Sequence, residues 1–322
     1  YSLQVTGTDV EGQITSAISY VTSEESTKLY WITGHGETEE SALSSQFTDA
    51  VSKSNMEVEE LTLLTSEIPE DADGIVIMAP TSDFSEEEAD KVISYLEGGG
   101  KALIFSSYTE TDLPNFDSVL ENYGVRREDG IIVESDSDYY YPQMPYVLLP
   151  EIQSSDITET VQDSYIIVPT AQAIVPLDSY RDSLSIESLL TTTDGAYIET
   201  DPENSTWTKS GDSETGAFDV GVSVTETVDD TETQIVYFSS LNMLAEQFDS
   251  AVSGANARLV ASALNQMCQV EESVSVPSKS LESSSLVFTA GSMNLWGIVV
   301  IAVIPAAFLI VGIGIWMKRR KQ

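Results

Sequence analysis

Residues 74–105 read GIVIMAPTSDFSEEEADKVISYLEGGGKALIF, and this stretch decides the fold. Both of its ends are short apolar runs of the kind that form buried strands. Between them, Ser85 followed by Glu88 three residues later is typical of a capping box at the start of a helix. The glycines at 98–100 indicate where that helix ends. A strand, a helix and a strand in this order predict two parallel strands joined by a right-handed crossover.

The same alternation extends on both sides of this unit. Upstream, apolar strands are predicted at 29–33 and 58–64, with an amphipathic helix at 41–54 between them. Downstream, the pattern predicts helices at 116–123 and 251–267, a brief helix at 185–190, and strands at 131–133, 165–168, 173–175, 218–224 and 234–238. The sequence therefore predicts an α/β fold with an open, mostly parallel sheet flanked by helices, and additional strands in the second half.

The end of the chain has a different character. Leu295 to Met317 is an uncharged and mostly apolar run, which as a helix would span about 34 Å, enough to cross a bilayer core. Lys318-Arg319-Arg320-Lys321 follows at once and predicts that this end is cytoplasmic. We therefore expect one C-terminal transmembrane helix in the cell membrane, a main domain outside, and contact with the lipid bilayer through Leu295–Met317.

These observations divide the chain into six predicted parts. They are an N-terminal segment at 1–27, an α/β domain at 28–135, a second half of the outer α/β region at 136–270, a Ser-rich tether at 271–294, the span at 295–317 and a basic tail at 318–322. The chain starts at Tyr1 without a signal peptide. We expect either that a leader was removed or that an upstream membrane helix is missing.

The charge is strongly acidic. There are 53 Asp and Glu residues against 14 Lys and Arg, and the formal net charge is −39. Such a surface repels nucleic acid and anionic headgroups, so no nucleic-acid partner is expected. The same surface suits a cell-surface protein, cation association or a saline habitat, and composition does not separate these readings.

Reactive side chains are scarce. The single cysteine, Cys268, excludes an intramolecular disulfide and lies in an apolar helical pattern typical of a core residue. A thiolate nucleophile needs a histidine partner, and the only histidine, His35, is far away in sequence. No cluster has the ligand spacing of a zinc or iron site, so neither a metal nor a cofactor is expected.

The candidate ligand-binding site is Gly34-His35-Gly36-Glu37, which directly follows a predicted strand. Ligands of open α/β sheets bind at the carboxyl ends of strands. The glycines permit a tight backbone there, His35 is able to transfer protons, and Glu37 would orient it or hold a cation. The alternative is a structural turn whose glycines serve geometry and whose His and Glu cap the following helix.

A second candidate surface is the acidic, tyrosine-rich stretch that begins at Asp136. Its residues Tyr139-Tyr140-Tyr141 would stack on a sugar, while Glu134, Asp136 and Asp138 would gather calcium. The spacing lacks the glycine and the terminal glutamate of a calcium loop. We expect an irregular, solvated excursion here, with prolines at 142, 145 and 150.

Several phrases in order resemble the GldG-like, gliding-motility-type auxiliary component of ABC transporters. They are Trp31-Ile32-Thr33-Gly34-His35-Gly36-Glu37, Ile68 to Asp73, Ala79-Pro80 through Ser85-Glu86-Glu87-Glu88, Gly98 to Lys101, Val276-Pro277-Ser278-Lys279-Ser280-Leu281, and the terminal helix with its basic end. The resemblance implies an outward domain similar to a glutamine-amidotransferase-like fold without its catalytic residues. It also implies an ABC permease and its ATPase as partners, and it supplies no catalytic residues to carry over.

The leading hypothesis is therefore a non-catalytic, membrane-anchored, extracytoplasmic accessory subunit of an ABC transporter or exporter. Its outer domain would bind substrate or a partner. One alternative is a surface glycan-binding or adhesion protein that uses the tyrosine-rich stretch. The other is an extracytoplasmic hydrolase that uses His35 and Glu37, for which no nucleophile or metal is identifiable in the sequence.

Overall fold

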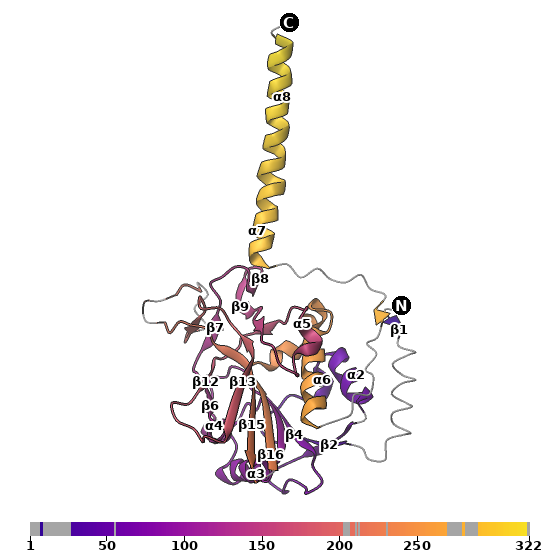
Figure 1. Cartoon of the computed structure of the whole chain (residues 1–322), viewed down its shortest axis with the longest axis vertical. Helices are drawn as coiled ribbons and strands as arrows, with labels where there is room; N and C mark the ends of the chain where they lie inside the picture. Colours follow the sequence, from indigo (N-terminus) through magenta and orange to yellow (C-terminus); the bar gives the residue numbers. More distant parts are fainter. Residues whose placement is uncertain are drawn as a thin grey trace.

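The chain folds into one large sheet with helices on both faces, from which a single long helix projects (Figure 1). The computed structural model describes residues 7–8, 27–54, 56–201, 207–209, 211, 213–229, 231–268, 279–280 and 289–320. Most of the predicted N-terminal segment 1–27 and of the predicted tether 271–294 lies outside these residues.

The main sheet joins strands from the first and the second half of the chain. Its order is β10 (Glu151–Ile152), β13 (Leu184–Thr191), β15 (Asp219–Val228), β16 (Thr231–Phe238), β5 (Lys101–Phe105), β4 (Gly74–Met78), β2 (Thr27–Ile32) and β3 (Met56–Leu61). The five strands from β16 to β3 are parallel. The other strands pair antiparallel; they include β12 (Ile174–Pro176), which pairs with β15, and β6 (Val125–Arg127), which pairs with β12. The predicted open, mostly parallel sheet with extra strands is confirmed.

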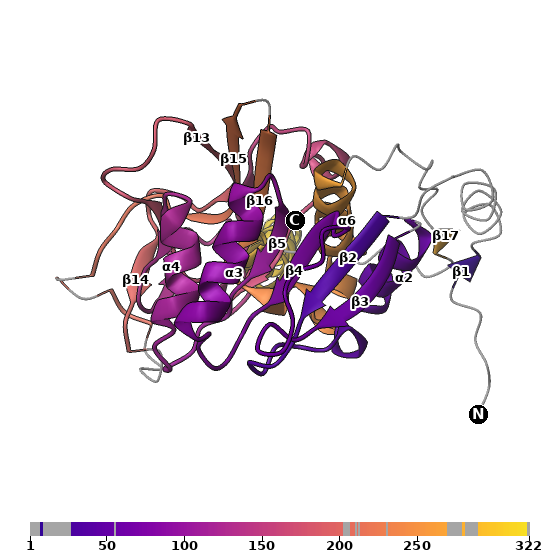
Figure 2. The ribbon, with the colours of Figure 1, turned by 90° about the horizontal axis from the view of Figure 1, so that it is seen from below.

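Helices cover the two faces of this sheet (Figure 2). One face carries α3 (Glu86–Glu97) and α4 (Pro114–Asn122). The other carries α2 (Ser45–Lys53) and α6 (Ala255–Met267), with the short α5 (Glu246–Ala251) before α6. Single 3-10 turns occur at Glu40–Ala42, Glu159–Val161 and Leu241–Leu244.

The central strands are apolar at every position because both of their faces are covered. In β4, Ile75 and Ile77 pack toward α3 and α4, whereas Val76 and Met78 pack toward α2 and α6. All four side chains have no exposed surface. This explains why the sequence of β4 is a continuous apolar run and not an alternating one.

Short antiparallel sheets complete the domain. One contains β8 (Tyr140–Tyr141), β9 (Met144–Leu148) and β11 (Val168–Pro169). The others pair β7 (Ile131–Val133) with β14 (Tyr197–Glu199), and β1 (Gly7–Thr8) with β17 (Lys279–Ser280). The irregular excursion predicted after Asp136 is therefore wrong in part, since β8, β9 and β10 lie within it.

The brief helix predicted at 185–190 is wrong. These residues belong to β13, which pairs with β15 and has a register shift between Ser188 and Leu190. The irregularity interrupts the alternation of apolar and polar residues, so that Ile186, Leu189 and Leu190 acquire the spacing of a helix face in the sequence. The conformation of residues 185–190 is decided by their pairing with β15, and the local sequence pattern holds no information about that pairing.

Two predicted helices are shorter than expected. The helix predicted at 41–54 begins only at Ser45, because Ser44 is its N-cap and accepts a hydrogen bond from the Phe47 amide. The helix predicted at 251–267 divides at Gly254, whose φ of 76° is left-handed and not helical, and α6 begins at the next residue.

The terminal helix is continuous from Ala290 to Arg320 over 31 residues. It consists of α7 (Ala290–Ile298), a π-helical turn at Val299–Val303 and α8 (Ile304–Arg320). The π turn ends two positions before Pro305, which has no N–H to donate, and the Ile304 amide bonds back to the carbonyl of Val299. This helix contains the whole predicted span and has the length and apolarity to cross a membrane.

Candidate functional site

The candidate motif lies where the order of the parallel strands reverses. The chain runs from β2 outward to the edge strand β3, and then returns to β4 on the other side of β2. Such a reversal is a topological switch point, beside which open α/β sheets form their ligand crevices. The motif 34–37 follows the carboxyl end of β2, and the loop 79–85 follows the carboxyl end of β4.

These two loops are joined to each other by backbone hydrogen bonds. The carbonyl of His35 accepts from the amides of Thr81 and Ser82, each at 2.9 Å, and the Thr38 amide donates to the carbonyl of Met78 at 3.0 Å. Gly36 has a φ of 76°, and a Cβ added there would meet the Thr81 hydroxyl at 2.2 Å. The glycine therefore permits both the turn and the close approach of the loops.

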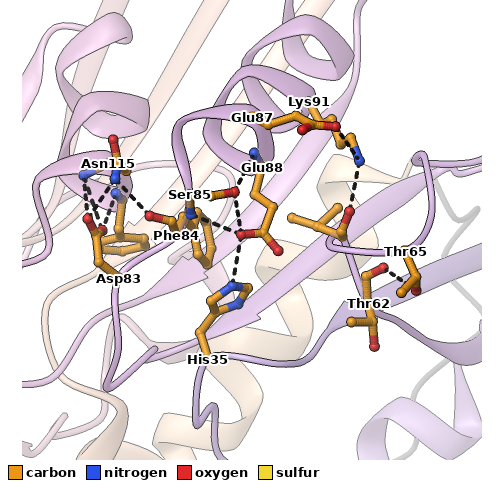
Figure 3. Close-up of polar contacts among 12 residues, drawn as sticks. His35, Thr62, Thr65, Asp83, Phe84, Ser85, Glu87, Glu88, Lys91 and Asn115 are labelled. Atoms are coloured by element: carbon orange, nitrogen blue, oxygen red, sulfur yellow. Dashed lines mark hydrogen bonds and ion pairs between the residues drawn. The ribbon is translucent and has the colours of Figure 1, made fainter.

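The imidazole of His35 lies between two carboxylates. Its Nδ1 is 3.1 Å from Glu37 Oε1. Its Nε2 is 3.2 Å from Glu88 Oε2, a contact that Figure 3 shows. The Phe84 ring packs edge-on at 4.6 Å between centroids. His35 is buried, with 8% of its surface exposed, so this ring is held inside the fold and does not project into solvent.

Glu88 occupies this position because it completes the capping box of α3. The Ser85 hydroxyl accepts from the Glu88 amide, while Glu88 Oε2 accepts from the Ser85 amide at 2.9 Å. Burial acts to raise the pKa of Glu88, but the hydrogen bonds from Ser85 and the neighbouring His35 outweigh it and hold that pKa below its usual value. The predicted capping box is confirmed, and its glutamate has a second partner that the sequence did not indicate.

His35 contacts one carboxylate with each of its two ring nitrogens. Nδ1 faces Glu37 and Nε2 faces Glu88, and both nitrogens are within hydrogen-bond distance of a carboxylate oxygen. We call His35, Glu37 and Glu88 the His35 cluster.

The loop after β4 fastens a second helix as well. Asp83 accepts hydrogen bonds from the backbone amides of Asn115 and Phe116, and from the Asn115 side-chain amide at 2.8 Å (Figure 3). The capping box and Asp83 thus connect the N-terminal ends of α3 and α4 to the switch point.

The His35 cluster is not built as a capping site for α2, the helix that follows it in sequence. Ser44 caps α2, and Glu37 instead turns back to accept from the His35 amide at 2.7 Å. Within the described ranges, no group of three or more His, Cys, Asp and Glu side chains is arranged to hold a metal ion. The cluster is therefore a hydrogen-bonded junction between the β2 loop and α3.

The other residues singled out in the sequence lie elsewhere. Cys268 follows α6 and is half-buried, and burial raises its pKa to about 12, so the thiol is a weak nucleophile. Glu134 is buried and accepts from the amides of Ser135 and Asp136. Tyr139 donates to Glu151 at 3.1 Å.

A polar, open cavity of about 450 Å³ lies away from the His35 cluster. It is lined by Ser154, Ser155, Asp156, Glu159, Gln162, Glu187 and Gln266.

Sequence reasoning missed Glu88 as a partner of His35, 53 residues away. The available signal was topological: a motif after one parallel strand and a helix N-terminus after the next parallel strand must share the same edge of the sheet.

Sequence reasoning also missed the role of Ser137 and Asp138, which contact the base of the terminal helix. The Gly291 amide donates to the Ser137 carbonyl at 2.7 Å, and the Thr289 hydroxyl donates to Asp138 at 3.2 Å.

Comparison with solved structures supports the fold. The protein titled "mmIFT52 N-terminal domain" is similar with a TM-score of 0.55 and 14% identity, over 74% of this chain and 97% of that one. "Exo-beta-1,4-mannosidase Op5Man5 from Opitutaceae bacterium strain TAV5" matches at a TM-score of 0.41 and 11% identity, over 75% of this chain and 36% of that one. Identities this low, and in the second case so low a TM-score, say nothing about activity.

Sequence comparison identifies the family. No curated protein matches the chain significantly. A family model described as "ABC-type uncharacterized transport system" matches residues 26–263, a range that includes the main sheet, its helices and the His35 cluster. The chain belongs to this family of auxiliary components of ABC-type transport systems.

Proposed function

We propose that this auxiliary component is a membrane-anchored subunit with its α/β domain outside the cell, beside an ABC permease and its ATPase. The domain is non-catalytic and binds substrate or a partner protein outside. Transport energy comes from the ATPase, and the terminal helix connects the outer domain to the permease within the membrane.

The terminal helix carries this proposal. Its large apolar side chains, among them Ile301, Phe308 and Ile310, are 70–79% exposed. Leaving such surface in water is unfavourable by roughly 25 cal/mol per Å², and a bilayer removes this cost. Lys318, Arg319 and Arg320 form the last turn, and positive charge at one end of a span favours the cytoplasmic side. The domain at the other end of the helix is then outside.

The geometry of the His35 cluster supports a non-catalytic role. Both ring nitrogens of His35 are bound to carboxylates, and the ring is buried. A general base needs access to the proton that it abstracts, and a nucleophile must lie within its hydrogen-bond reach. The Thr81 hydroxyl donates to the His35 carbonyl and the Ser85 hydroxyl to Glu88, so neither of these two hydroxyls donates to the ring.

The test is recovery of the full chain from its native membranes in mild detergent, followed by mass spectrometry of bound proteins. We expect a polytopic permease and an ATPase. Protease treatment of sealed cells tests sidedness. An outside domain is cleaved while the cells are still sealed, whereas an inside domain is cleaved only after lysis. Recovery of the chain alone, or protection of the domain in sealed cells, would contradict the proposal.

A further inference from the structure

The terminal helix starts on the surface of the domain, at a contact that we call the helix seat. Thr289 and Ala290 are 9% and 6% exposed, so the beginning of α7 is buried against the domain. The seat consists of the two hydrogen bonds from Gly291 and Thr289 to Ser137 and Asp138. A Cβ on Gly291 would meet Asp138 Oδ1 at 2.0 Å, so a side chain at this position would displace the Asp138 carboxylate.

The seat lies close to the apolar part of the span. Leu295 is four positions after Gly291, which corresponds to about 6 Å along a helix. The headgroup layer on each side of a bilayer is about 5–8 Å thick. If Leu295 marks the start of the hydrocarbon, Ser137 and Asp138 are at the depth of the lipid headgroups.

The chain that follows the seat forms the β8–β9 hairpin, which comprises residues 140–148. Figure 1 shows β8 directly beside the base of α7. Tyr139, Tyr140 and Tyr141 are half-buried, and Met144 is 39% exposed. Tyrosine is enriched at membrane–water interfaces, because its apolar ring and polar hydroxyl suit the two sides of that boundary.

We propose that the β8–β9 hairpin contacts the lipid headgroup layer and holds the domain against the membrane surface. This inference rests on the proposed function, since it requires the helix to span a bilayer. The exposed carboxylates of Asp136 and Asp138 beside the hairpin disfavour anionic headgroups, so the contact is with zwitterionic lipid. Lipid is favoured over a protein as the contact of this hairpin. The short distance from the helix seat to Leu295 already places the hairpin at the depth of the headgroups, without any partner protein.

The test uses spin labels on the full chain in phosphatidylcholine vesicles. Cys268→Ala removes the native thiol, and single cysteines are then introduced at Met144 in the hairpin, at Glu97 and at Phe308. Glu97 is exposed at the end of α3, and Figure 1 shows α3 at the end of the domain opposite the terminal helix. Collision of each label with oxygen, which concentrates in lipid, is compared with collision with a water-soluble nickel complex.

We expect the oxygen-to-nickel collision ratio at 144 to be severalfold higher than at 97 and lower than at 308. A ratio at 144 equal to that at 97 overturns the membrane contact while leaving the anchor intact, provided that 308 reports lipid. An aqueous reading at 308 overturns the proposed anchor itself, and the hairpin contact with it. A label at 144 shielded from both reagents indicates a second copy of the chain, and would also overturn the lipid contact.

Discussion

His35 Nε2 lies 3.2 Å from Glu88 Oε2, and this contact joins the loop after β2 to the first turn of α3. The same glutamate oxygen accepts from the amide and the hydroxyl of Ser85. One carboxylate therefore completes a helix cap and holds the imidazole at the switch point of the sheet.

We expect Glu88→Ala to lower the free energy of unfolding by about 1–3 kcal/mol, because it leaves the buried His35 ring without this acceptor and removes half of the capping box with Ser85. Thermal unfolding of the full chain in detergent micelles measures this. Glu87→Ala is the matched control, since Glu87 has an 83% exposed side chain on the same helical turn. Substitutions at such exposed positions change the free energy of unfolding by no more than about 0.5 kcal/mol. Equal losses for the two variants would show that the cluster adds nothing to stability.

Glu226 makes the stability depend on pH. Hydrogen bonds from Arg181, aided by Ser183, outweigh burial and lower the pKa of Glu226. Below about pH 4.3 the unfolded chain therefore binds more protons at Glu226 than the folded chain does. The stabilisation from this ion pair is present above that pH and is lost as pH falls through the lowered pKa of Glu226.

We expect Glu226→Gln to flatten the stability profile in this acidic range relative to the unmodified chain. Glu232→Gln, on an exposed position of the neighbouring strand β16, is the control that should leave the slope unchanged. Asp249 acts in the opposite direction, because burial raises its pKa, and it contributes equally to all three chains. An unchanged slope in Glu226→Gln would refute the assignment to this ion pair.

Cys268 should resist alkylation in the folded chain. Its pKa is raised to about 12 by burial, so little thiolate forms at pH 8. The rate of iodoacetamide labelling at pH 8 is expected to rise by at least an order of magnitude in denaturant, where the thiol returns to its ordinary pKa of about 8.5. Since the chain has one cysteine, the measurement is unambiguous. Rapid labelling of the folded protein would contradict the raised pKa of Cys268.

Gly36→Ala is expected to destabilise the switch point for two separable reasons. The left-handed φ of 76° costs an L-residue about 1–2 kcal/mol, and the new Cβ displaces the Thr81 hydroxyl. In the double variant Gly36→Ala with Thr81→Ala, the displacement is relieved but the backbone strain remains. Thermal unfolding should therefore show partial recovery, expressed as a non-additive effect of the two changes. Full additivity would mean that the two loops do not press on each other.

Gly291→Ala tests the helix seat. The added methyl group meets Asp138, so the hydrogen bonds from Thr289 and Gly291 are expected to break while the helix stays in the membrane. Gly297→Ala is the matched control, because nothing lies within 4 Å of its Cβ position. A spin label at Met144 should become more mobile in the first variant and remain unchanged in the second. The same mobility in both variants would show that the seat does not orient the domain.

Local patterns were enough to predict much of the sheet and the helix over it. The apolar run at 74–79, the capping box at Ser85 and the glycines at 98–100 each act over a few residues, and the structure confirms all three. The terminal span is predictable for the same reason, since its length and apolarity are properties of a continuous segment. The error at 185–190 arose where a register shift in β13 broke the local period.

The sequence alone determined the fold class, the long apolar C-terminal helix and the position of the motif at 34–37 after a strand, because these depend on composition, periodicity and order along the chain. Only the tertiary structure decided that β2 and β4 are neighbours, that Glu88 reaches His35, and that Asp138 meets Thr289 at the base of the helix. Those contacts join residues far apart in the chain. They form only when sheet pairing and burial of apolar faces bring separate segments together, and no short-range pattern specifies that step.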